Sequence, residues 1–377
     1  MEYKRLGDYI REVNVRNKDL KVTKLVGLTI DKAFIPSVAN VIGTDLSNYK
    51  VIRKEQFACS LMQVSRDGKM PVAMFEEDAA IMSPAYPMFE VIDKKTLLPQ
   101  YLMMWFSRSE FDREASYYAV GGVRGSLTWE DFCNMKFPVP SIDRQREIVE
   151  EYETLSRRIR LNEQMIEKLE ATAQALYRKM FVDSIDKENL PEGWRMGFLT
   201  DVATYLNGIA CQKYETNESD FLPVLKIREL TQGHCDSNSD HVSLDIPNDY
   251  IIDDGDVIFS WSATLFIDIW CGGKSALNQH LFKVSSERFP KWFVFLWTLY
   301  HIDEWKRLIS AKATSMGHIK REDLESAEVV IPSKTSLIEI NSHFEPLFEL
   351  YTLKKKESLK LSELQSLLLA KMGRLKQ

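Results

Sequence analysis

Two stretches of this chain, GSLTWEDF at residues 125–132 and GHIKREDL at residues 317–324, begin the same succession of landmarks. At a constant offset of 192 the matching pairs are Asp131 and Asp323, Pro140 and Pro332, Ile148 and Ile340, Leu155 and Leu347, Leu169 and Leu361, Leu176 and Leu368, and Lys179-Met180 and Lys371-Met372. An offset that holds from residue 125 to residue 180 indicates a duplicated unit. Two copies of this size predict two related domains, each followed by its own helix.

The duplication also includes the start of each copy. Arg5-Leu6-Gly7-Asp8-Tyr9-Ile10 corresponds to Phe198-Leu199-Thr200-Asp201-Val202-Ala203. Short apolar runs rich in β-branched and aromatic residues follow and predict strands: KLVGLTI, QFACSLMQV and MFEVI, then FLPVLKI, DVIFSWSA and LFKV. Each copy then has an aromatic, helix-like segment, YLMMWFSRSEFDREA or WFVFLWTLYHIDEWKRL. The strand-rich centres of the two copies align poorly, although the frames around them (the start of each copy and the segment that leads into its helix) align well. This suggests related modules that read different targets.

After Pro140-Ser141 and Pro332-Ser333 the apolar period becomes helical. Steps of four and three residues predict a coiled-coil seam, formed by Leu155, Ile159, Asn162, Ile166, Leu169, Ala173, Leu176 and Met180 in the first copy and by Leu347, Tyr351, Lys354, Ser358, Leu361, Gln365, Leu368 and Met372 in the second. The polar centre of the second seam predicts weaker or wetter pairing. Ordinary amphipathic helices that cover a domain are the alternative. Pro346 is expected to begin the second long helix or to kink the chain just before it.

Connectivity then predicts the architecture. A short linker from Asp183 to Arg195 joins the first helix to the second domain, so the second helix must run back along the first, with one domain at each end. The predicted fold is α+β, with two mixed α/β domains at residues 1–141 and 183–333, and helices at 142–182 and 334–377 that form a long antiparallel coiled coil. The seam from Leu155 to Met180 spans roughly 39 Å, close to one turn of B-DNA at about 34–36 Å.

Bulk composition narrows the class of protein. The 377 residues are 45% hydrophobic and 28% charged, as in an ordinary globular protein. No run of eighteen apolar residues occurs and the start, MEYKRLGDYI, lacks a signal-peptide core, so the expected location is cytoplasmic, with no membrane partner. Five scattered cysteines, Cys59, Cys133, Cys211, Cys235 and Cys271, fit reduced thiols better than a disulfide framework.

Charge is distributed unevenly along the chain. The net charge of −6 argues weakly against a nucleic-acid partner. Residues 1–140 have 19 basic and 18 acidic side chains, whereas residues 183–332 have 14 basic and 24 acidic ones. Any DNA binding must therefore depend on local basic loops rather than on the overall field.

The chain resembles the specificity (S) subunit of type I restriction-modification enzymes. The resemblance rests on Leu6-Gly7-Asp8 and its counterpart at Leu199, on Leu190-Pro191-Glu192-Gly193-Trp194, and on the helix entries Val139-Pro140-Ser141 and Ile331-Pro332-Ser333. It also rests on the helix from Gln145-Arg146-Glu147-Ile148-Val149 to Leu176-Tyr177-Arg178-Lys179-Met180, and on GDVIFSWSA at 255–263 with Leu277-Asn278-Gln279-His280. Thr200 in place of a second Gly7, and the acidity of the second domain, depart from the family pattern.

This resemblance implies a non-catalytic DNA-specificity subunit. Each target-recognition domain would read one half of a bipartite, asymmetric site in double-stranded DNA, and the helices would set the half-site spacing. The helices would also dock two modification (methyltransferase) subunits, through which restriction (translocase and nuclease) subunits join. No cofactor is expected in this chain, since S-adenosylmethionine, ATP and Mg would be bound by the partner subunits.

No catalytic signature in the sequence is complete. Gly272-Gly273-Lys274-Ser275 has the tail of a phosphate-binding loop, but Asp268 stands where the motif needs a glycine. Cys211, His234, Cys235 and His241 are metal-capable but lack the spacing of a zinc site. All six histidines follow residue 230, so the two copies share no general-base histidine. No metal site is predicted.

Candidate DNA contacts are Arg, Lys, Gln, Asn and Ser side chains in loops between strands, because these match phosphates and base edges. In the first domain they are Arg11, Arg16, Lys18, Lys21, Lys24, Gln63, Ser65, Arg66, Lys69 and Arg124. In the second they are Gln212, Lys213, Tyr214, Lys226, Arg228, Lys274, Asn278, Gln279, His280, Lys312, Lys320 and Arg321. For each the alternative is a solvated surface residue, and Trp261 is expected to pack inside the domain rather than stack on a base.

Two other classes of function compete with DNA specificity. A non-catalytic scaffold would use paired domains to bind proteins and its helices only to dimerise, and its binding would respond little to salt. A standalone hydrolase is disfavoured because no catalytic constellation is complete.

Overall fold

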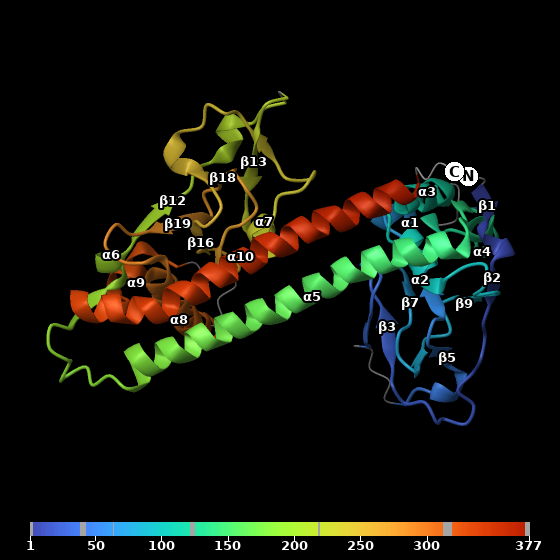
Figure 1. Cartoon of the computed structure of the whole chain (residues 1–377), viewed down its shortest axis with the longest axis horizontal. Helices are drawn as coiled ribbons and strands as arrows, with labels where there is room; N and C mark the ends of the chain where they lie inside the picture. Colours follow the sequence, from blue (N-terminus) through green and yellow to red (C-terminus); the bar gives the residue numbers. More distant parts are fainter. Residues whose placement is uncertain are drawn as a thin grey trace. The chain divides into compact units, whose positions relative to one another are not determined.

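The computed structural model describes residues 3–37, 43–62, 64–120, 125–217, 219–311 and 319–373. The chain forms two compact units (Figure 1). Unit 1 comprises Met1–Arg157 and Ser362–Gln377, and unit 2 comprises Arg158–Leu361. Two long helices, α5 (Ile142–Arg178) and α10 (Lys334–Met372), each contribute residues to both units. Among the described residues, no helix combines the length and apolar character needed to cross a membrane.

Unit 1 is closed by its first and last strands. β1 (Tyr3–Arg5) pairs antiparallel with β10 (Lys136–Pro138), which ends just before α5 begins. The main sheet has the order β2-β9-β6-β7, from β2 (Ile10–Glu12), β9 (Met88–Val91), β6 (Phe57–Cys59) and β7 (Val72–Met74). Two strand pairs, β3 (Val26–Leu28) with β4 (Phe34–Pro36) and β5 (Lys50–Arg53) with β8 (Ala79–Met82), complete the β-structure. Helices α1 (Val64–Asp67), α2 (Pro99–Phe106), α3 (Ser109–Ala119) and α4 (Trp129–Asn134) accompany them.

Unit 2 has the same frame. β11 (Arg195–Phe198) pairs antiparallel with β20 (Glu328–Ile331), and the main sheet has the order β12-β19-β16-β17, from β12 (Thr204–Asn207), β19 (Leu281–Ser285), β16 (Val257–Ser260) and β17 (Phe266–Ile269). A second sheet is ordered β14-β13-β18-β15, from β14 (His241–Val242), β13 (Leu222–Leu225), β18 (Ser275–Leu277) and β15 (Ile251–Ile252). Its helices are α6 (Leu199–Val202), α7 (Ile227–Gln232), α8 (Lys291–Ala311) and α9 (Arg321–Ser326).

The internal repeat is therefore a repeat of structure. α4 and α9 begin 192 residues apart, and so do α5 and α10. Tyr3 lies opposite Pro138 in unit 1, as Met196 lies opposite Val330 in unit 2. The two main sheets share one strand order, whereas the second sheet of unit 2 has no four-stranded counterpart in unit 1. Similar frames with different additions agree with the poor alignment of the two sequence centres.

The long helices run antiparallel within each unit. In unit 1 the amide of Gln365 donates to the hydroxyl of Ser156 at 2.6 Å, and in unit 2 Arg158 Nε donates to Glu357 Oε1 at 2.7 Å. As α5 advances, its contacts on α10 move backwards, since Leu169 and Ala173 line the same apolar gap as Leu347. Every residue of the two expected seams is buried or half-buried. The predicted fold class, two mixed α/β domains with a long antiparallel helix pair, is confirmed.

Two local expectations are wrong. Pro346 neither begins nor precedes the second long helix, because α10 starts at Lys334 and continues through it. Pro346 and Ser342 are exposed, so the carbonyl that loses its helical donor faces solvent, while Phe344 and Phe348 pack against the core. The aromatic segment of unit 1 is also not one helix, since Ser107 and Arg108 separate α2 from α3.

An ion pair holds α10 on the main sheet of unit 2. Lys355 Nζ lies 2.5 Å from Asp268 Oδ2 on β17, with both side chains at most 15% exposed. The hydroxyl of Tyr351 donates to Asp268 Oδ1 at 2.8 Å, and burial together with the Asp268 charge raises the pKa of Tyr351. Lys356, the next residue, pairs with Asp254 at 3.1 Å on a more exposed surface.

We expect Lys355→Met to lower the free energy of unfolding of unit 2 by about 3 kcal/mol, because it leaves the buried Asp268 carboxylate without its cation. Lys356→Met is the matched control and should cost less than about 0.5 kcal/mol. Urea unfolding followed by tryptophan fluorescence reports on unit 2, which holds six of the eight tryptophans. Equal effects of the two substitutions would contradict the anchoring role of Lys355.

Candidate nucleic-acid interface

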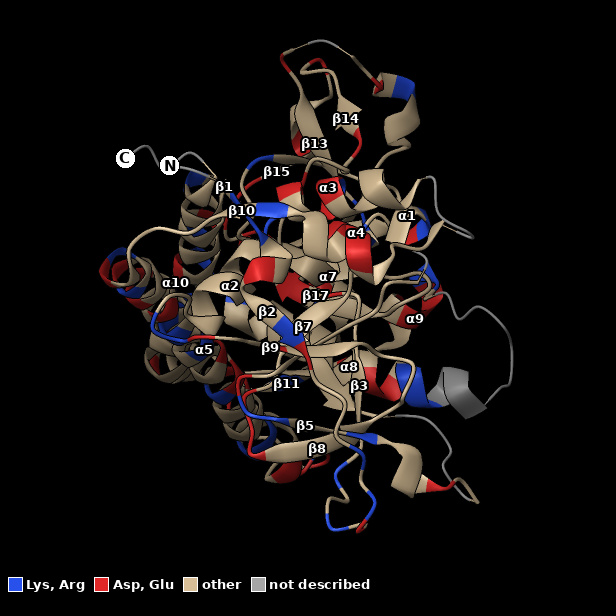
Figure 2. Cartoon of the chain, turned by 90° about the vertical axis from the view of Figure 1, so that its right-hand side faces the viewer, with Lys and Arg blue, Asp and Glu red and all other residues tan. Residues whose placement is uncertain are grey.

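The first group of candidate contacts in unit 1 lies on the segment between β2 and β3. Backbone bridges join Arg16 to Lys50 and Leu25 to Ile81, so this segment runs beside β5 and β8. Arg16 Nη1 donates to the carbonyl of Asn48 at 2.6 Å. Figure 2 shows basic loops beyond β5 and β8 at the lower edge of the view. The candidates on this segment are Arg16, Lys18, Lys21 and Lys24.

A second group surrounds α1. Ser65 Oγ donates to the carbonyl of Gly125 at 3.4 Å, which brings the loop after β6 against the glycine-rich loop. Gly125 has a φ of +70°, and a Cβ there would lie 2.1 Å from Ser65 Oγ, so only glycine allows this approach. Arg66 and Lys69 lie on the same turn. Gln63 and Arg124, which belong to these loops, are outside the described residues.

Most of the described cations in unit 1 already have a carboxylate partner. Arg11 on β2 donates to Glu90 on β9 at 2.6 Å, so it braces two neighbouring strands. The other pairs are Lys21–Asp19, Lys24–Glu77, Arg66–Asp67 and Lys69–Asp31. A phosphate would have to compete with these carboxylates. Of the candidates in the described part of unit 1, Lys18 is exposed and has neither an ion pair nor a hydrogen bond.

In unit 2 the structure brings six candidate residues into one open hollow of about 320 Å³, lined by Gln212, Lys226, Arg228, Asn278, Gln279 and His280 together with Ile227. They come from the 3-10 turn Cys211–Tyr214, the start of α7 and the loop between β18 and β19. Three segments separated by up to 68 residues therefore present amide, imidazole and cationic groups to one space. Such groups match the donors and acceptors of base edges.

Close backbone packing builds this hollow. Gly208 lies against the loop that follows β18, and a Cβ at this position would stand 2.2 Å from the carbonyl oxygen of Asn278. Ile209 N donates to Leu277 O at 3.1 Å, which ties the segment before Gln212 to the end of β18. Any side chain at position 208 would push Gln212 and Gln279 apart.

Three successive residues of the loop differ in their exposure. Asn278 is 2% exposed, and its Oδ1 accepts from the backbone N–H of His280 at 3.3 Å. Its amide donates to Gln279 Oε1 at 3.0 Å. Gln279 is half-buried and His280 is exposed. Asn278 therefore shapes the loop, while Gln279 and His280 are available to a ligand.

The residues around His280 include some that the sequence did not single out. Ser262 Oγ lies 3.2 Å from His280 Nδ1, and Trp261 Nε1 donates to Asn207 Oδ1 at 3.1 Å. Trp261 is half-buried, with its ring 5.9 Å from that of Phe282. Asn207 ends β12 and Ser262 lies two residues after the end of β16, positions that could have marked them as polar groups beside the hollow.

The cations of the hollow are held by acids of unit 2. Arg228 contacts Asp236 at 3.0 Å and Glu229 at 2.5 Å, and Lys226 pairs with Asp240. The Arg228 guanidinium lowers the pKa of Asp236 to about 2, and the two carboxylates raise the pKa of Arg228. These contacts give the acidity of the second domain a local role, since part of it fixes the basic residues in place.

The remaining candidates of unit 2 lie outside the hollow. Tyr214 packs partly buried beside Cys211, while Lys213 and Lys274 are exposed. Lys320 and Arg321 begin α9, where Arg321 pairs with Glu325 at 3.0 Å, and the preceding Ile319 N donates to Trp261 O. Lys312 lies outside the described residues.

The two weak chemical motifs have structural explanations. Gly273 adopts a φ of +79° in a turn, where its N–H donates to Asp254 Oδ1 at 2.8 Å and its carbonyl accepts from Trp270. The backbone N–H that would donate to a phosphate in a phosphate-binding loop thus donates to a carboxylate instead. Burial raises the pKa of Cys211 to about 11. Within the described ranges, no three His, Cys, Asp or Glu side chains gather in a way that could hold a metal ion.

Comparison with known proteins agrees with this organisation. The type I restriction modification DNA specificity domain matches residues 45–171 and 191–363. The chain is 23% identical over 303 residues to the type I restriction enzyme MjaIX specificity subunit of Methanocaldococcus jannaschii, covering 75% of this chain and 70% of that protein. It is 25% identical over 150 residues to the EcoBI specificity subunit of Escherichia coli, covering 38% of this chain and 30% of that protein.

A solved structure shares the fold. The S subunit of a type I restriction-modification system from M. genitalium superposes with a TM-score of 0.58, covering 100% of this chain and 96% of that one, at 12% sequence identity. At that identity the likeness concerns the fold alone.

We expect Gln279→Ala to reduce discrimination between matched and mismatched bases in one half-site by about 10- to 100-fold, because a bidentate amide–base contact contributes on the order of 1–3 kcal/mol. Lys213→Ala is the contrasting variant, since we expect this exposed cation to contact a phosphate rather than a base. It should weaken binding to all duplexes alike and reduce the salt slope by about 1. Fluorescence anisotropy against duplexes altered in one half-site at a time gives both quantities. Gln279 is no base reader if its loss weakens matched and mismatched duplexes equally.

Proposed function

Because the chain belongs to the type I restriction-modification DNA specificity family, we propose that unit 1 and unit 2 each read one half of a bipartite, asymmetric DNA site. The observation that carries this proposal is the shared strand order of the two main sheets combined with unrelated additions to them. A conserved frame gives two equivalent ways to approach a duplex, and different additions give different base preferences. The hollow that contains Gln212, Gln279 and His280 is the proposed reading site of unit 2.

The long helices are proposed to set the distance between the two half-sites. The antiparallel contacts seen within each unit, Ser156 with Gln365 and Arg158 with Glu357, fix the register of one helix on the other. Asn162, a buried polar residue in the seam, is suited to disfavour other registers. A fixed register makes the spacing a property of helix length.

Part of the helix pair is also the proposed docking surface for modification subunits. In unit 1, Leu155, Leu364, Leu367 and Leu368 line an open groove of about 590 Å³, and Leu367 is 57% exposed. Glu147, Glu150, Glu151 and Lys371 border it. An exposed apolar strip with a charged border is typical of a protein–protein contact.

Catalysis is proposed to belong to partner subunits: adenine methylation to two modification subunits, and cleavage to restriction subunits that join through them. S-adenosylmethionine, ATP and Mg²⁺ would bind to those partners. The incomplete catalytic motifs of this chain and the engagement of Gly273 by Asp254 support this division. The proposed location is the cytoplasm, where the DNA target is accessible.

We expect the chain, assembled with its modification subunit, to bind one bipartite duplex at least about 1,000-fold more tightly than scrambled DNA, the usual margin of specific readers. Affinity for both duplexes should fall steeply with added salt, because phosphate contacts release counterions. Binding across a randomised duplex library at two salt concentrations measures both. Indifference to sequence together with salt-insensitive binding to proteins would favour the scaffold function instead.

Inserting seven residues into α5 and seven into α10, at facing positions of the seam, should lengthen the preferred gap between half-sites by about three base pairs. The reason is that seven helical residues add roughly 10 Å while the seam stays in phase. The matched control substitutes seven exposed residues of the same helices, outside the seam, without adding any residue, and should leave the gap unchanged. An unchanged gap in the inserted variant would show that the helices do not determine the spacing.

A further inference from the structure

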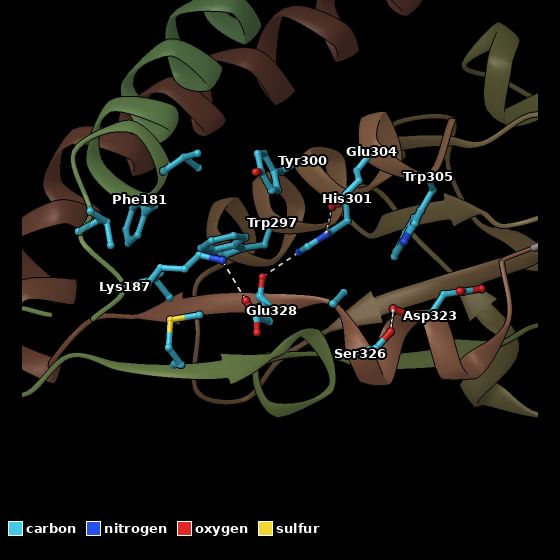
Figure 3. A pocket seen from close by; sticks show the side chains of 15 residues that line it. Phe181, Lys187, Trp297, Tyr300, His301, Glu304, Trp305, Asp323, Ser326 and Glu328 are labelled. Atoms are coloured by element: carbon cyan, nitrogen blue, oxygen red, sulfur yellow. Dashed lines mark hydrogen bonds and ion pairs between the residues drawn. The ribbon is translucent and has the colours of Figure 1, made fainter. Parts of the chain in front are cut away.

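Unit 2 contains a second hollow, of about 410 Å³ (Figure 3), and none of its lining residues is a candidate DNA contact. It lies where the π-helical turn Lys179–Asp183, which continues α5, and the segment after it meet β11, β20, α8 and α9. Its lining combines aromatic rings, chiefly Trp297, Tyr300 and Trp305, with the carboxylates of Glu304, Asp323 and Glu328. We call it the aromatic–acidic pocket.

The charge balance of the aromatic–acidic pocket is negative. Lys187 is the one cationic side chain among its lining residues, and it is paired with Glu328 at 2.9 Å. His301 is buried and tied to the carbonyl of Glu328 at 2.9 Å, and burial lowers its pKa, so it stays neutral near pH 7. Among the described residues, Glu304, 52% exposed, has an ion-pairing contact only with this imidazole, at 3.3 Å. The pocket therefore favours a cation and disfavours the phosphates of DNA.

Trp297 adds a polar feature to the pocket. Its side chain is 3% exposed, and its indole N–H has no hydrogen-bond acceptor among the described residues. A buried donor without a partner costs free energy, and any ligand that shifts the Tyr300 ring will change the surroundings of this indole, which packs against it.

The corresponding place in unit 1 is already occupied by an arginine. α2 and α8 begin 192 residues apart, which aligns Trp105 with Trp297 and Arg108 with Tyr300. Arg108 is 6% exposed, with its guanidinium carbon 4.1 Å from the centre of the Trp105 ring. Its Nε donates to the carbonyl of Leu369 at 2.9 Å, and its Nη2 lies 3.5 Å from Glu110.

The two units therefore differ in what lies beside the aligned tryptophans, Trp105 and Trp297. Unit 1 covers its tryptophan with its own guanidinium, whereas unit 2 has a phenol at that position and an open pocket beside it. The aligned strand position also reverses its charge, from Lys136 on β10 to Glu328 on β20. Unit 2 thus has the receiving groups for an arginine but no arginine of its own there.

We propose that the aromatic–acidic pocket binds an arginine side chain of a partner polypeptide. The guanidinium stacks on the half-buried ring of Tyr300, which packs edge-on against Trp297, and pairs with Glu304 and Glu328. Arginine fits better than lysine because its planar, weakly hydrated head both stacks on aromatic rings and forms forked bonds to carboxylates. This contact does not require that the chain read DNA.

The direct test titrates the full chain with Nα-acetyl-arginine amide and follows the indole N–H resonance of Trp297, assigned by its loss in Trp297→Phe. The expected dissociation constant is on the order of 1 mM, the range open to a ligand of this size. Nα-acetyl-citrulline amide, which lacks the charge, and Nα-acetyl-lysine amide should each bind at least about tenfold more weakly. Equal binding of all three compounds, or no shift at about 20 mM arginine amide, would overturn the proposal.

Two substitutions locate the binding. Glu328→Lys gives unit 2 the charge of unit 1 at this strand position, and Tyr300→Arg supplies a guanidinium from within the chain. Each should weaken the arginine probe at least about tenfold. Glu322→Lys, an exposed change on α9 outside the lining, is the matched control and should leave binding unchanged. The Glu328 side chain is 56% exposed, so we expect the Glu328→Lys variant to fold. If this variant still bound the arginine probe, the arginine would have to bind elsewhere.

Discussion

The architecture depends on one backbone constraint, which is met twice. In each unit the first strand pairs antiparallel with the strand that comes just before the long helix, β1 with β10 and β11 with β20. This pairing brings the beginning of each domain to the base of its helix. The two pairings have the same register, since Tyr3 lies opposite Pro138 as Met196 lies opposite Val330. Segments between the paired strands are free to change where they do not contact a long helix, whereas Asp268 on β17 holds α10.

The two units differ in what they add to their main sheets. Unit 1 adds two strand pairs to its main sheet, and unit 2 adds a four-stranded sheet and a dense set of acidic side chains. The acids have specific contacts: Asp236 and Asp240 hold Arg228 and Lys226 at the hollow proposed to read DNA, and Asp268 anchors α10 through Lys355. At the aromatic–acidic pocket, Glu304 and Glu328 lie on a surface that favours a protein partner over a phosphate. The acidity of unit 2 is thus compatible with DNA recognition, because some of its acidic side chains hold basic residues or α10 in place and others line a separate pocket.

Sequence reasoning was most successful where a signal is periodic or repeated. The offset of 192 and the helical spacing after residue 141 identified the two frames and the long helices, because these depend on local pattern. Pro346 was misjudged, since tertiary packing of Phe344 and Phe348 outweighs one missing backbone bond. The ion pairs Lys24–Glu77 and Lys226–Asp240 join positions 53 and 14 residues apart, and no helical or strand periodicity predicts them. Asn278 shows the same limit, because its residue type favours a surface site while the close approach of Gly208 buries it. The individual DNA contacts remain predictions.

Whether the two units read two half-sites can be measured by genome-wide sequencing of N6-methyladenine, in a strain that carries this gene with its modification partner and in the same strain without it. We expect one methylated motif to disappear with the gene, and this motif to have two different specified halves separated by an unspecified gap of constant length. A continuous motif without such a gap, or a methylation pattern that does not change when the gene is removed, would show that the two units do not read a bipartite site.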